Sequence, residues 1–288
     1  MITLENEFLV VKAKFEGAEL ISIFSKKDNM EYIWQGDTNY WRFHAPICFP
    51  IIGSLVDDTC FVDNKPYNMT VHGFARDMNF DIYKQEKDSV SFILKSNDET
   101  LKKYPYKFSL IISYKLINNK ITVSYEVRNE DNKEIYFSIG AHTAFNCPVI
   151  PDLKTEDYYL SFKEQDIQPF LLFDGFLTDK KKILYKKTNQ IPVSKELFGN
   201  GVIILENLEN KEITIGSYKN SHCVTMSFED FPYLAIWSKI EGAPFICIEP
   251  WFGLPDAVGL SRELKNKKAI QKLGNKEVFK CSHEIKIG

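Results

Sequence analysis

Three polar residues that can exchange protons stand in short segments rich in apolar residues. Glu249 ends an apolar run and is followed at once by Pro250 and Trp251, and His142 comes at the end of an apolar segment. A carboxylate in an aromatic, partly dry site gains affinity for protons and makes a competent general base. A histidine titrates near neutrality and can give or take a proton. Together with His72, which lies between apolar residues, these groups suit proton transfer on a small polar substrate.

Arg76 and Trp237 could hold such a substrate. Arg76 lies four residues after His72 in the segment VHGFARD, and arginine is scarce in a chain with 4 arginines and 32 lysines. The planar guanidinium can bind a carboxylate, a phosphate or sugar hydroxyls with a rigid fork that lysine lacks. Trp237 offers a flat apolar face on which the C–H face of a sugar could pack.

Each of these residues also has a purely structural interpretation. The two histidines could be hydrogen-bonded core residues, and Arg76 could form a surface ion pair. Glu249 could be paired with an arginine or with backbone N–H groups, because buried charges need partners. Trp237 could simply belong to the core. Composition and spacing leave both interpretations open.

Several well-known functional motifs are absent from the chain. It has no glycine-rich dinucleotide fingerprint, no P-loop, no HExxH motif and no GxSxG elbow. Its five histidines are not at zinc-ligand spacing with its six cysteines. No nucleophile stands beside a base, which disfavours covalent catalysis. The sequence therefore predicts no cofactor and no bound metal, although a metal held by residues distant in the sequence stays an open alternative.

The composition predicts a folded chain that binds neither nucleic acid nor a membrane. Hydrophobic residues make up 44% of the chain, and the net charge is only −3. The six cysteines include no CxxC pair, which predicts buried side chains in a reducing compartment. The segment MITLENEFLV lacks a secretory pattern, and no apolar run reaches the length of a membrane span. We expect a cytoplasmic protein, and the sequence does not indicate its oligomeric state.

The dominant periodicity is two, which is typical of half-buried β-strands. Residues 107–130 show it best, with Asn118-Asn119 between two alternating runs, and this pair predicts a hairpin because asparagine tolerates positive φ. Similar patterns occur in FLVVKAKF, AELISIFS, SVSFILKS, EIYFSIG, GVIILENL, EITIGSY and APFICIE. The best helical segment is NDETLKKY, capped by Asn97 or Asp98. No linker is evident, so residues 1–288 are expected to form one domain, an antiparallel all-β sandwich or barrel.

Five short motifs follow one another along the chain: CFPIIGSL at 48–55, HGFAR at 72–76, DETLKKYPYKF at 98–108, GAHTAFN at 140–146 and CIEPWFGLPDA at 247–257. In this order they resemble the aldose 1-epimerase (galactose mutarotase-like) family, and within it the LacX-type branch. HGFAR alone is weakly specific, whereas the ordered set is strongly specific and covers most of the chain. The resemblance implies an all-β fold, an antiparallel β-supersandwich with few short helices and a cleft across a concave sheet face.

The resemblance also implies an activity, the interconversion of the α and β anomers of an aldose or aldose phosphate. Glu249 stands where the family has its general base, which takes the proton of the C1 hydroxyl. His142 matches the general acid, which protonates the ring oxygen, and His72 matches a second histidine that hydrogen-bonds the sugar. The expected substrate contacts are Arg76, Trp237 and Asn146. No metal or cofactor is expected, and the partner implied is a hexose or hexose phosphate.

Two departures from the family pattern concern the choice of sugar. The better-known galactose mutarotase branch carries an arginine near the first motif, but CFPIIGSL has none. Arg42 lies several residues earlier, and either Arg42 or a lysine could take its place. The aspartate that helps to bind hydroxyls in that branch has no evident counterpart. The reaction type is therefore better supported than the sugar.

Three other functions are compatible with these residues. A non-catalytic carbohydrate-binding or sugar-sensing sandwich would keep the cleft, but the presence of both acid and base favours an enzyme. A glycoside hydrolase would need Glu249 and a second carboxylate, such as Asp256 or Glu229, about 5–10 Å away. That mechanism would leave the histidines unexplained. A structural or regulatory partner is the third alternative, for which the sequence has no interface signature.

Overall fold

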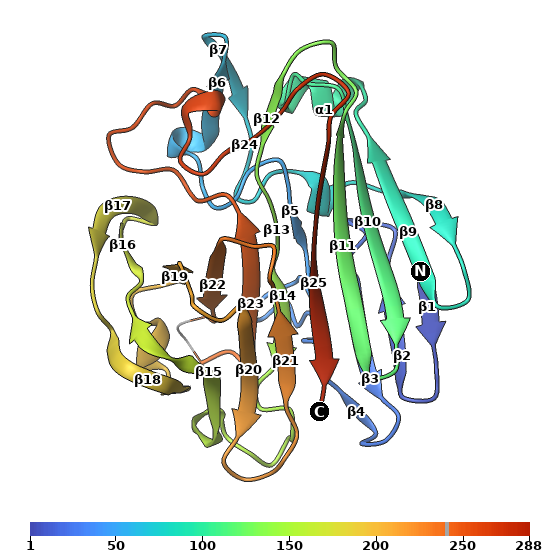
Figure 1. Cartoon of the computed structure of the whole chain (residues 1–288), viewed down its shortest axis with the longest axis vertical. Coiled ribbons are helices and arrows are strands. Elements are labelled where there is room, and N and C mark those ends of the chain that lie inside the picture. Colours follow the sequence, from blue (N-terminus) through green and yellow to red (C-terminus); the bar gives the residue numbers. More distant parts are fainter. Residues whose placement is uncertain (240–241) are drawn as a thin grey trace.

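The computed structural model describes residues 1–239 and 242–288 and consists largely of antiparallel β-strands (Figure 1). The largest sheet has nine strands in the order β18-β15-β20-β21-β25-β11-β10-β9-β8. Their bounds are β8 Asp81–Gln85, β9 Ser89–Lys95, β10 Phe108–Ile117, β11 Lys120–Asn129, β15 Tyr158–Ile167, β18 Tyr185–Pro192, β20 Glu212–Ser217, β21 Val224–Ser227 and β25 Val278–Ile287.

A second sheet of six strands has the order β19-β22-β23-β13-β5, with β14 also paired to β23. Its strands are β5 Ile47–Cys48, β13 Ile139–Ala141, β14 Thr143–Asn146, β19 Ile203–Glu206, β22 Tyr233–Trp237 and β23 Phe245–Phe252. Leu110 and Ile112 of β10 share one buried apolar cluster with Ile246 and Ile248 of β23. The two large sheets therefore pack their inner faces against one another, as a sandwich requires.

The remaining elements are short. A four-stranded sheet contains β1 Ile2–Glu5, β2 Leu9–Ala13, β3 Leu20–Ser25 and β4 Met30–Glu31. Three strand pairs are β6 Thr59–Val62 with β7 Lys65–Asn68, β12 Ile135–Phe137 with β24 Gln271–Leu273, and β16 Phe170–Phe173 with β17 Phe176–Lys181. The described helices are α1 Asp98–Lys103 and the 3₁₀ turns η1 Val56–Asp58, η2 Ala75–Asp77, η3 Thr155–Asp157, η4 Glu196–Phe198 and η5 Leu264–Asn266. The predicted all-β fold with few short helices is confirmed.

Local sequence explains the hairpin and the helix. Ile117 pairs with Lys120 across a two-residue turn in which Asn118 has φ of 53°, so the predicted hairpin is confirmed. The side chain of Asn97 accepts hydrogen bonds from the backbone N–H groups of Glu99 and Thr100 at 3.0 Å. Asn97 is therefore the N-cap of α1, which settles the choice between Asn97 and Asp98.

The segment EIYFSIG was expected to be one strand, and this expectation is wrong. β12 ends just before Ser138, and β13 begins just after it. The two strands belong to different sheets, because β12 pairs with β24 whereas β13 pairs with β23 and β5. The backbone N–H of Ser138 donates to the carbonyl of Pro50 at 2.7 Å instead of to a strand. The alternation of apolar residues does not reveal this exchange of partners.

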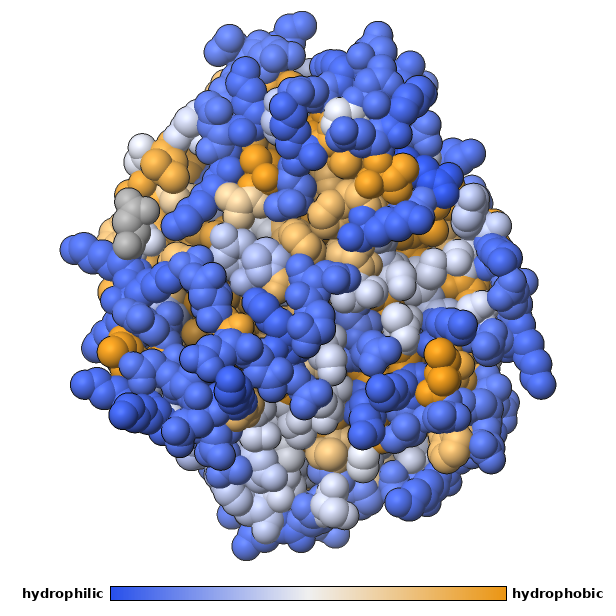
Figure 2. Space-filling view, viewed as in Figure 1, coloured by the Kyte–Doolittle hydropathy of each residue, from blue (hydrophilic) through white to orange (hydrophobic). Residues whose placement is uncertain are grey.

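Hydrophilic residues cover most of the face seen in Figure 2, and hydrophobic residues appear there in areas interrupted by hydrophilic side chains. Within residues 1–239 and 242–288, no helix has both the length and the apolar character that crossing a lipid bilayer demands.

Candidate active site

A cavity of about 290 Å³ brings together five of the six residues predicted for the site: His72, Arg76, His142, Trp237 and Glu249. They come from segments far apart in the sequence. Glu249 lies on β23, Trp237 ends β22, and His142 lies between β13 and β14. The other two belong to the segment that runs from β7 into η2. Antiparallel pairing of β23 with β22, β13 and β14 fixes the relative positions of Glu249, Trp237 and His142.

The alternation of β23 directs Glu249 into the cavity. Alternate residues of a strand face opposite sides, so Ile246 and Ile248 enter the core while Glu249 and Trp251 line the cavity. Glu249 is 1% exposed, and its Oε2 lies 3.2 Å from Nε2 of His142. The strand register therefore places a buried carboxylate and a buried imidazole in direct contact.

Burial moves the pKa values of Glu249 and His142 in opposite directions. It raises the pKa of the Glu249 carboxyl well above its ordinary value, since the charged form loses its hydration. It also lowers the pKa of His142 to about 3, with a smaller contribution from the positive charge of Arg76. In water a carboxyl group loses its proton before an imidazolium does. Burial therefore reduces the free-energy cost of moving a proton from His142 to Glu249.

His72 lies beside this pair in a fixed orientation. Its ring centre is 5.0 Å from that of His142, edge to face. The backbone N–H of Gly53 donates to Nδ1 of His72 at 3.2 Å, and the N–H of His72 donates to the carbonyl of Gly53 at 3.0 Å. Sγ of Cys48 is also 3.2 Å from Nδ1. Burial, aided by nearby His142 and Arg76, lowers the pKa of His72 well below its ordinary value, so its ring is neutral.

Arg76 is a cation at the wall of the cavity. Its side chain is 10% exposed, and its guanidinium carbon lies 4.7 Å from the ring centre of Phe43. Its Nε forms no hydrogen bond with any described residue, although Oδ2 of Asp77 is 3.7 Å away. Burial lowers the pKa of Arg76, but an arginine remains charged at neutral pH. A positive charge with free donors is therefore available to a polar ligand.

Arg42 does not take the place of the missing arginine inside the cavity. Its side chain is 60% exposed, donates to Oδ1 of Asp77 at 2.9 Å, and contacts the ring of Phe43. It is not among the residues that line the cavity. Arg42 instead neutralises Asp77, which also lies beside Arg76.

Trp41 is a cavity residue that sequence reasoning missed. Its ring stacks on His142 with centres 4.8 Å apart and an angle of 29° between planes. Trp237 meets both rings at a steep angle, 5.6 Å from Trp41 and 5.7 Å from His142. Trp41 lies in a loop between β4 and β5, where no periodic pattern marks it, and the only signal is its position beside Arg42 in NYWRF. The aromatic rings restrict the orientation of His142.

The structure does not bring Asn146 into this group. Its side-chain amide donates to the backbone carbonyl of Glu31 at 2.9 Å, and the residue is not part of the cavity wall. β14 pairs it with Phe245, at the opposite end of β23 from Trp251. Its predicted contact with substrate remains a prediction, and its observed role is to tie β14 to β4.

The carboxylates proposed for a glycoside hydrolase lie elsewhere. Asp256 forms an ion pair with Lys267 and accepts from the N–H of Val56 at 2.9 Å. Neither Asp256 nor Glu229 lines the cavity, and among the described lining residues Glu249 is the single carboxylate. This arrangement gives no support to a mechanism with two carboxylates.

One group of buried side chains has the composition of a metal site. Nitrogen of His142, sulfur of Cys247 and oxygen of Glu249 all lie within 4.8 Å of one another. Such a set could in principle ligate zinc, but the sulfur would have to be a thiolate. Burial raises the pKa of Cys247 well above its ordinary value, with a further contribution from Glu249. The expectation of no metal therefore remains a prediction, and acid–base chemistry can use His142 and Glu249 alone.

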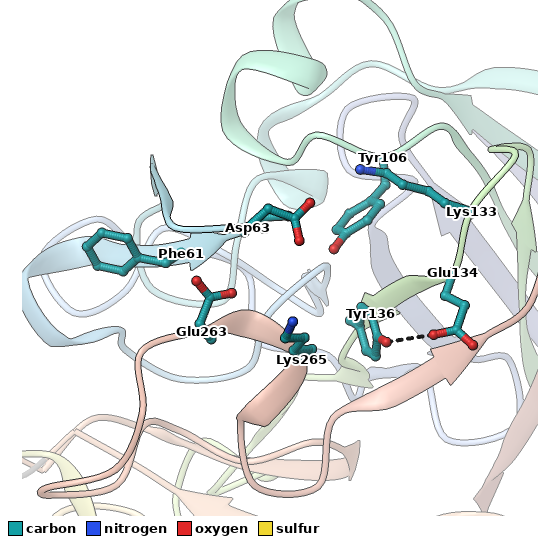
Figure 3. A pocket seen from close by; sticks show the side chains of 9 residues that line it. Phe61, Asp63, Tyr106, Lys133, Glu134, Tyr136, Glu263 and Lys265 are labelled. Carbon is teal, nitrogen blue, oxygen red and sulfur yellow. Dashed lines mark hydrogen bonds between the residues drawn. The ribbon is translucent and has the colours of Figure 1, made fainter.

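A second cavity, of about 380 Å³, is drawn in Figure 3. Charged side chains and two tyrosines line it, and the hydroxyl of Tyr136 donates to Glu134 at 2.8 Å. Asp63, Lys133 and Lys265 are exposed, so water can satisfy their charges. The smaller cavity is the candidate active site because the buried carboxyl group of Glu249 and the buried imidazole of His142 lie there.

The chain is similar to a family of sugar isomerases over most of its length. A family model described as Aldose 1-epimerase matches residues 1–271. The chromosomal LacX protein of Lactococcus lactis subsp. lactis is 35% identical over 296 residues, which cover 99% of this chain and 99% of that protein.

Two solved structures share the fold. A galactose mutarotase-like protein from Lactobacillus casei is 36% identical with a TM-score of 0.93, and the match covers 100% of both chains. A galactose mutarotase related enzyme from Lactobacillus acidophilus is 29% identical with a TM-score of 0.95, covering 100% of this chain and 97% of that one. The sandwich is therefore the galactose mutarotase-like fold.

Proposed function

We propose that this chain interconverts the α and β anomers of an aldose by general acid–base catalysis. The chain belongs to the aldose 1-epimerase family, and within it to the LacX-type branch, and the proposal starts from this membership. Membership supports a sugar epimerase or mutarotase. The single observation that carries the finer proposal is the buried contact of 3.2 Å between Glu249 and His142 at the wall of a cavity.

In the proposed reaction Glu249 takes the proton of the C1 hydroxyl while His142 gives a proton to the ring oxygen. The bond between C1 and the ring oxygen then breaks, and the C1 hydroxyl oxygen becomes the carbonyl oxygen of an aldehyde. After rotation about C1–C2, the freed hydroxyl attacks the other face of the aldehyde, returns its proton to His142, and Glu249 reprotonates the new C1 hydroxyl. One proton passes from His142 to Glu249 on ring opening and back on ring closure, so each conversion leaves both groups as they began, and burial lowers the free-energy cost of the first transfer.

The remaining cavity residues would hold the sugar. His72 is neutral, and Nε2 carries its proton because Nδ1 accepts from Gly53, so Nε2 can donate to a sugar oxygen. Trp41 and Trp237 offer apolar ring faces and edges, and Arg76 offers charged donors. Since a guanidinium also binds phosphate well, an aldose phosphate is the alternative substrate class to a free aldose.

The deciding experiment follows anomer exchange by polarimetry or NMR on fresh α-D-glucose, α-D-galactose and their 6-phosphates. Wild-type protein should accelerate exchange, and Glu249→Gln should lower the rate about 10²–10⁴-fold while the fold stays intact, since it removes the base. Glu229→Gln, which changes an exposed carboxylate outside the cavity, is the matched control and should behave as wild type.

Three outcomes discriminate between the functions. Full activity of Glu249→Gln would refute the assignment of the base. No acceleration by folded wild-type protein, combined with saturable sugar binding, would support the carbohydrate-binding alternative. Acceleration with the 6-phosphates alone, lost in Arg76→Met, would identify an aldose phosphate as the substrate.

A further inference from the structure

A buried ion pair lies just outside the cavity and takes no part in the proposed proton transfers. Asp256 and Lys267 are each 7% exposed, and the ammonium of Lys267 contacts Oδ1 of Asp256. Asp256 follows β23 and Lys267 follows η5. Most lysines are exposed because a buried charge loses its hydration, and an ion pair repays that loss only with good geometry and further hydrogen bonds. The pair therefore calls for an explanation.

Asp256 connects three segments of the chain. Its Oδ2 accepts from the N–H of Val56 at 2.9 Å, and its own N–H donates to the carbonyl of Ser54 at 3.2 Å. Its carbonyl accepts from the N–H of Leu177 on β17 at 2.8 Å. Lys267 holds the other carboxylate oxygen. One residue thus joins the segment 53–56, the hairpin β16–β17 and the loop after β23.

Each connected segment supplies part of the cavity wall. Gly53 and Ser54 line the cavity from the first segment, Gly175 from the turn of the hairpin, and Pro255 from the loop after β23. Gly53 and Pro255 are in close contact, since a Cβ on Gly53 would lie 2.5 Å from Cγ of Pro255. A shift of the loop that carries Asp256 would therefore displace Gly53.

Gly53 in turn favours one tautomer of His72, whose Nδ1 also lies 3.2 Å from Sγ of Cys48, a group that can donate or accept there. A backbone N–H can only donate, so Nδ1 of His72 must accept the hydrogen bond of 3.2 Å from Gly53. In the neutral ring the proton is then on Nε2. The carbonyl of Gly53 also fixes the backbone of His72, which has φ of 64°, an unfavourable value for a residue with a Cβ.

We propose that Asp256 is a positioning residue of the active site: Lys267 neutralises its buried carboxylate, and the hydrogen bond that this carboxylate accepts from Val56 fixes the segment 53–56, so that Gly53 holds His72 in the Nε2–H tautomer. In this tautomer Nε2–H donates toward the cavity. The effect on reaction rate rests on the proposed function, whereas the tautomer of His72 does not depend on it.

The test compares variants that differ in the acceptor for the N–H of Val56. Asp256→Asn with Lys267→Met removes both charges and keeps an acceptor, and Asp256→Val with Lys267→Met removes the acceptor as well. Replacing a buried ion pair by uncharged groups of similar volume is often tolerated by the fold. Val56→Pro breaks the same hydrogen bond from its other end. Proline suits this position because Leu55 has extended backbone angles of −96° and 149° and Val56 begins η1.

The readouts are the tautomer of His72, from ¹⁵N NMR of histidine-labelled protein without sugar, and kcat and KM for anomer exchange. The Asn/Met variant should keep the Nε2–H tautomer and a kcat close to wild type. The Val/Met variant and Val56→Pro should populate the Nδ1–H tautomer and lower kcat by up to about 100-fold, the scale of a small misplacement in an active site.

Two results would overturn the proposal. One is a wild-type tautomer in folded Val56→Pro or Val/Met protein. The other is an activity loss of equal size in the Asn/Met and Val/Met variants, which would trace the effect to charge instead of the hydrogen bond. If wild-type protein shows no anomer exchange, the NMR comparison still decides the positioning role, so failure of the proposed function is distinguishable.

Discussion

At the scale of single residues, the site depends on two buried groups whose protonation differs from that in water. Glu249 and His142 face one another at 3.2 Å, and both prefer their uncharged forms because water does not reach them. The proposed cycle needs one proton on this pair, and burial keeps that proton bound at a pH where an exposed glutamate would already be ionised. The pH at which the pair loses its proton is measurable without knowing the preferred sugar.

We predict that kcat/KM for anomer exchange falls as pH rises through a pKa well above the ordinary glutamate value of about 4.3. The proposed cycle needs one proton on the pair formed by His142 and Glu249. Burial keeps this proton bound to higher pH by raising the pKa of Glu249, and a second proton binds only near the pKa of His142, about 3. The measurement is a pH profile of kcat/KM for wild type and Glu249→Gln. A fall in kcat/KM centred near the ordinary glutamate value, or an alkaline limb that persists unchanged in the residual activity of Glu249→Gln, would contradict this prediction.

Residue types in apolar contexts point to most of the cavity residues but not to their roles. His72, His142 and Glu249 are polar groups in apolar segments, which need a partner or a function, and the structure brings them together in one cavity. Their catalytic roles remain predictions. Trp41 could not be predicted because its importance comes from stacking on His142, a contact between residues about a hundred positions apart. Asp256 was considered as a catalytic carboxylate, since the sequence cannot show its pairing with Lys267.

At the scale of secondary-structure elements, the site depends on the close approach of β13 and β23. Gly140 pairs with Trp251, and a Cβ on Gly140 would lie 2.6 Å from Cδ1 of Trp251 and 2.9 Å from the carbonyl oxygen of Pro250. Small residues directly before His142 in the sequence predict that a ligand or another backbone comes close there. The structure shows that the backbone of β23 does so.

We predict that Gly140→Ala lowers the free energy of unfolding by about 1–3 kcal/mol, the usual cost of overpacking. It should also lower the rate of anomer exchange. The added methyl group must push Trp251 and β23 away, which moves Glu249 relative to His142. Gly199→Ala is the control, because Gly199 has helical angles of −58° and −23° that alanine adopts readily. Denaturant unfolding and kcat of both variants provide the measurement. Equal effects of the two substitutions would show that the contact with Trp251 does not matter.

The extent of single elements was more predictable than their pairing. The hairpin β10–β11 is encoded locally, by two alternating runs and an Asn-Asn turn. By contrast, EIYFSIG has one alternating pattern, yet it divides into two strands with different partners. β12 pairs with residues 271–273, whereas β13 pairs with strands at 47–48 and 245–252. Local patterns determine which residues face inward, but the hydrogen-bond partners of a strand lie elsewhere in the sequence.

At the scale of the whole molecule, the nine-stranded sheet joins segments in an order far from that of the sequence. β25, the last strand, lies between β21 and β11, and its buried residues include Cys281 and Ile285 of the same core cluster as Leu4 of β1. Figure 1 shows β25 running along β11 over most of its length. No periodicity in the sequence predicts this placement. The continuous core supports our proposal that residues 1–288 form one domain.

We predict that removal of residues 278–288 prevents folding, whereas removal of residues 1–5 does not. Loss of β25 would leave the inner edges of β11 and β21 without hydrogen-bond partners and open the core between them, so the chain should be recovered in the insoluble fraction. β1 pairs with β2 alone and lies at the edge of its sheet, so its loss should mainly remove buried Leu4, at about 2–5 kcal/mol. Solubility, circular dichroism and anomer exchange of both truncations give the comparison. A soluble, active protein without residues 278–288 would show that the sheet tolerates an opening at its centre, and that the two halves of the sandwich fold independently.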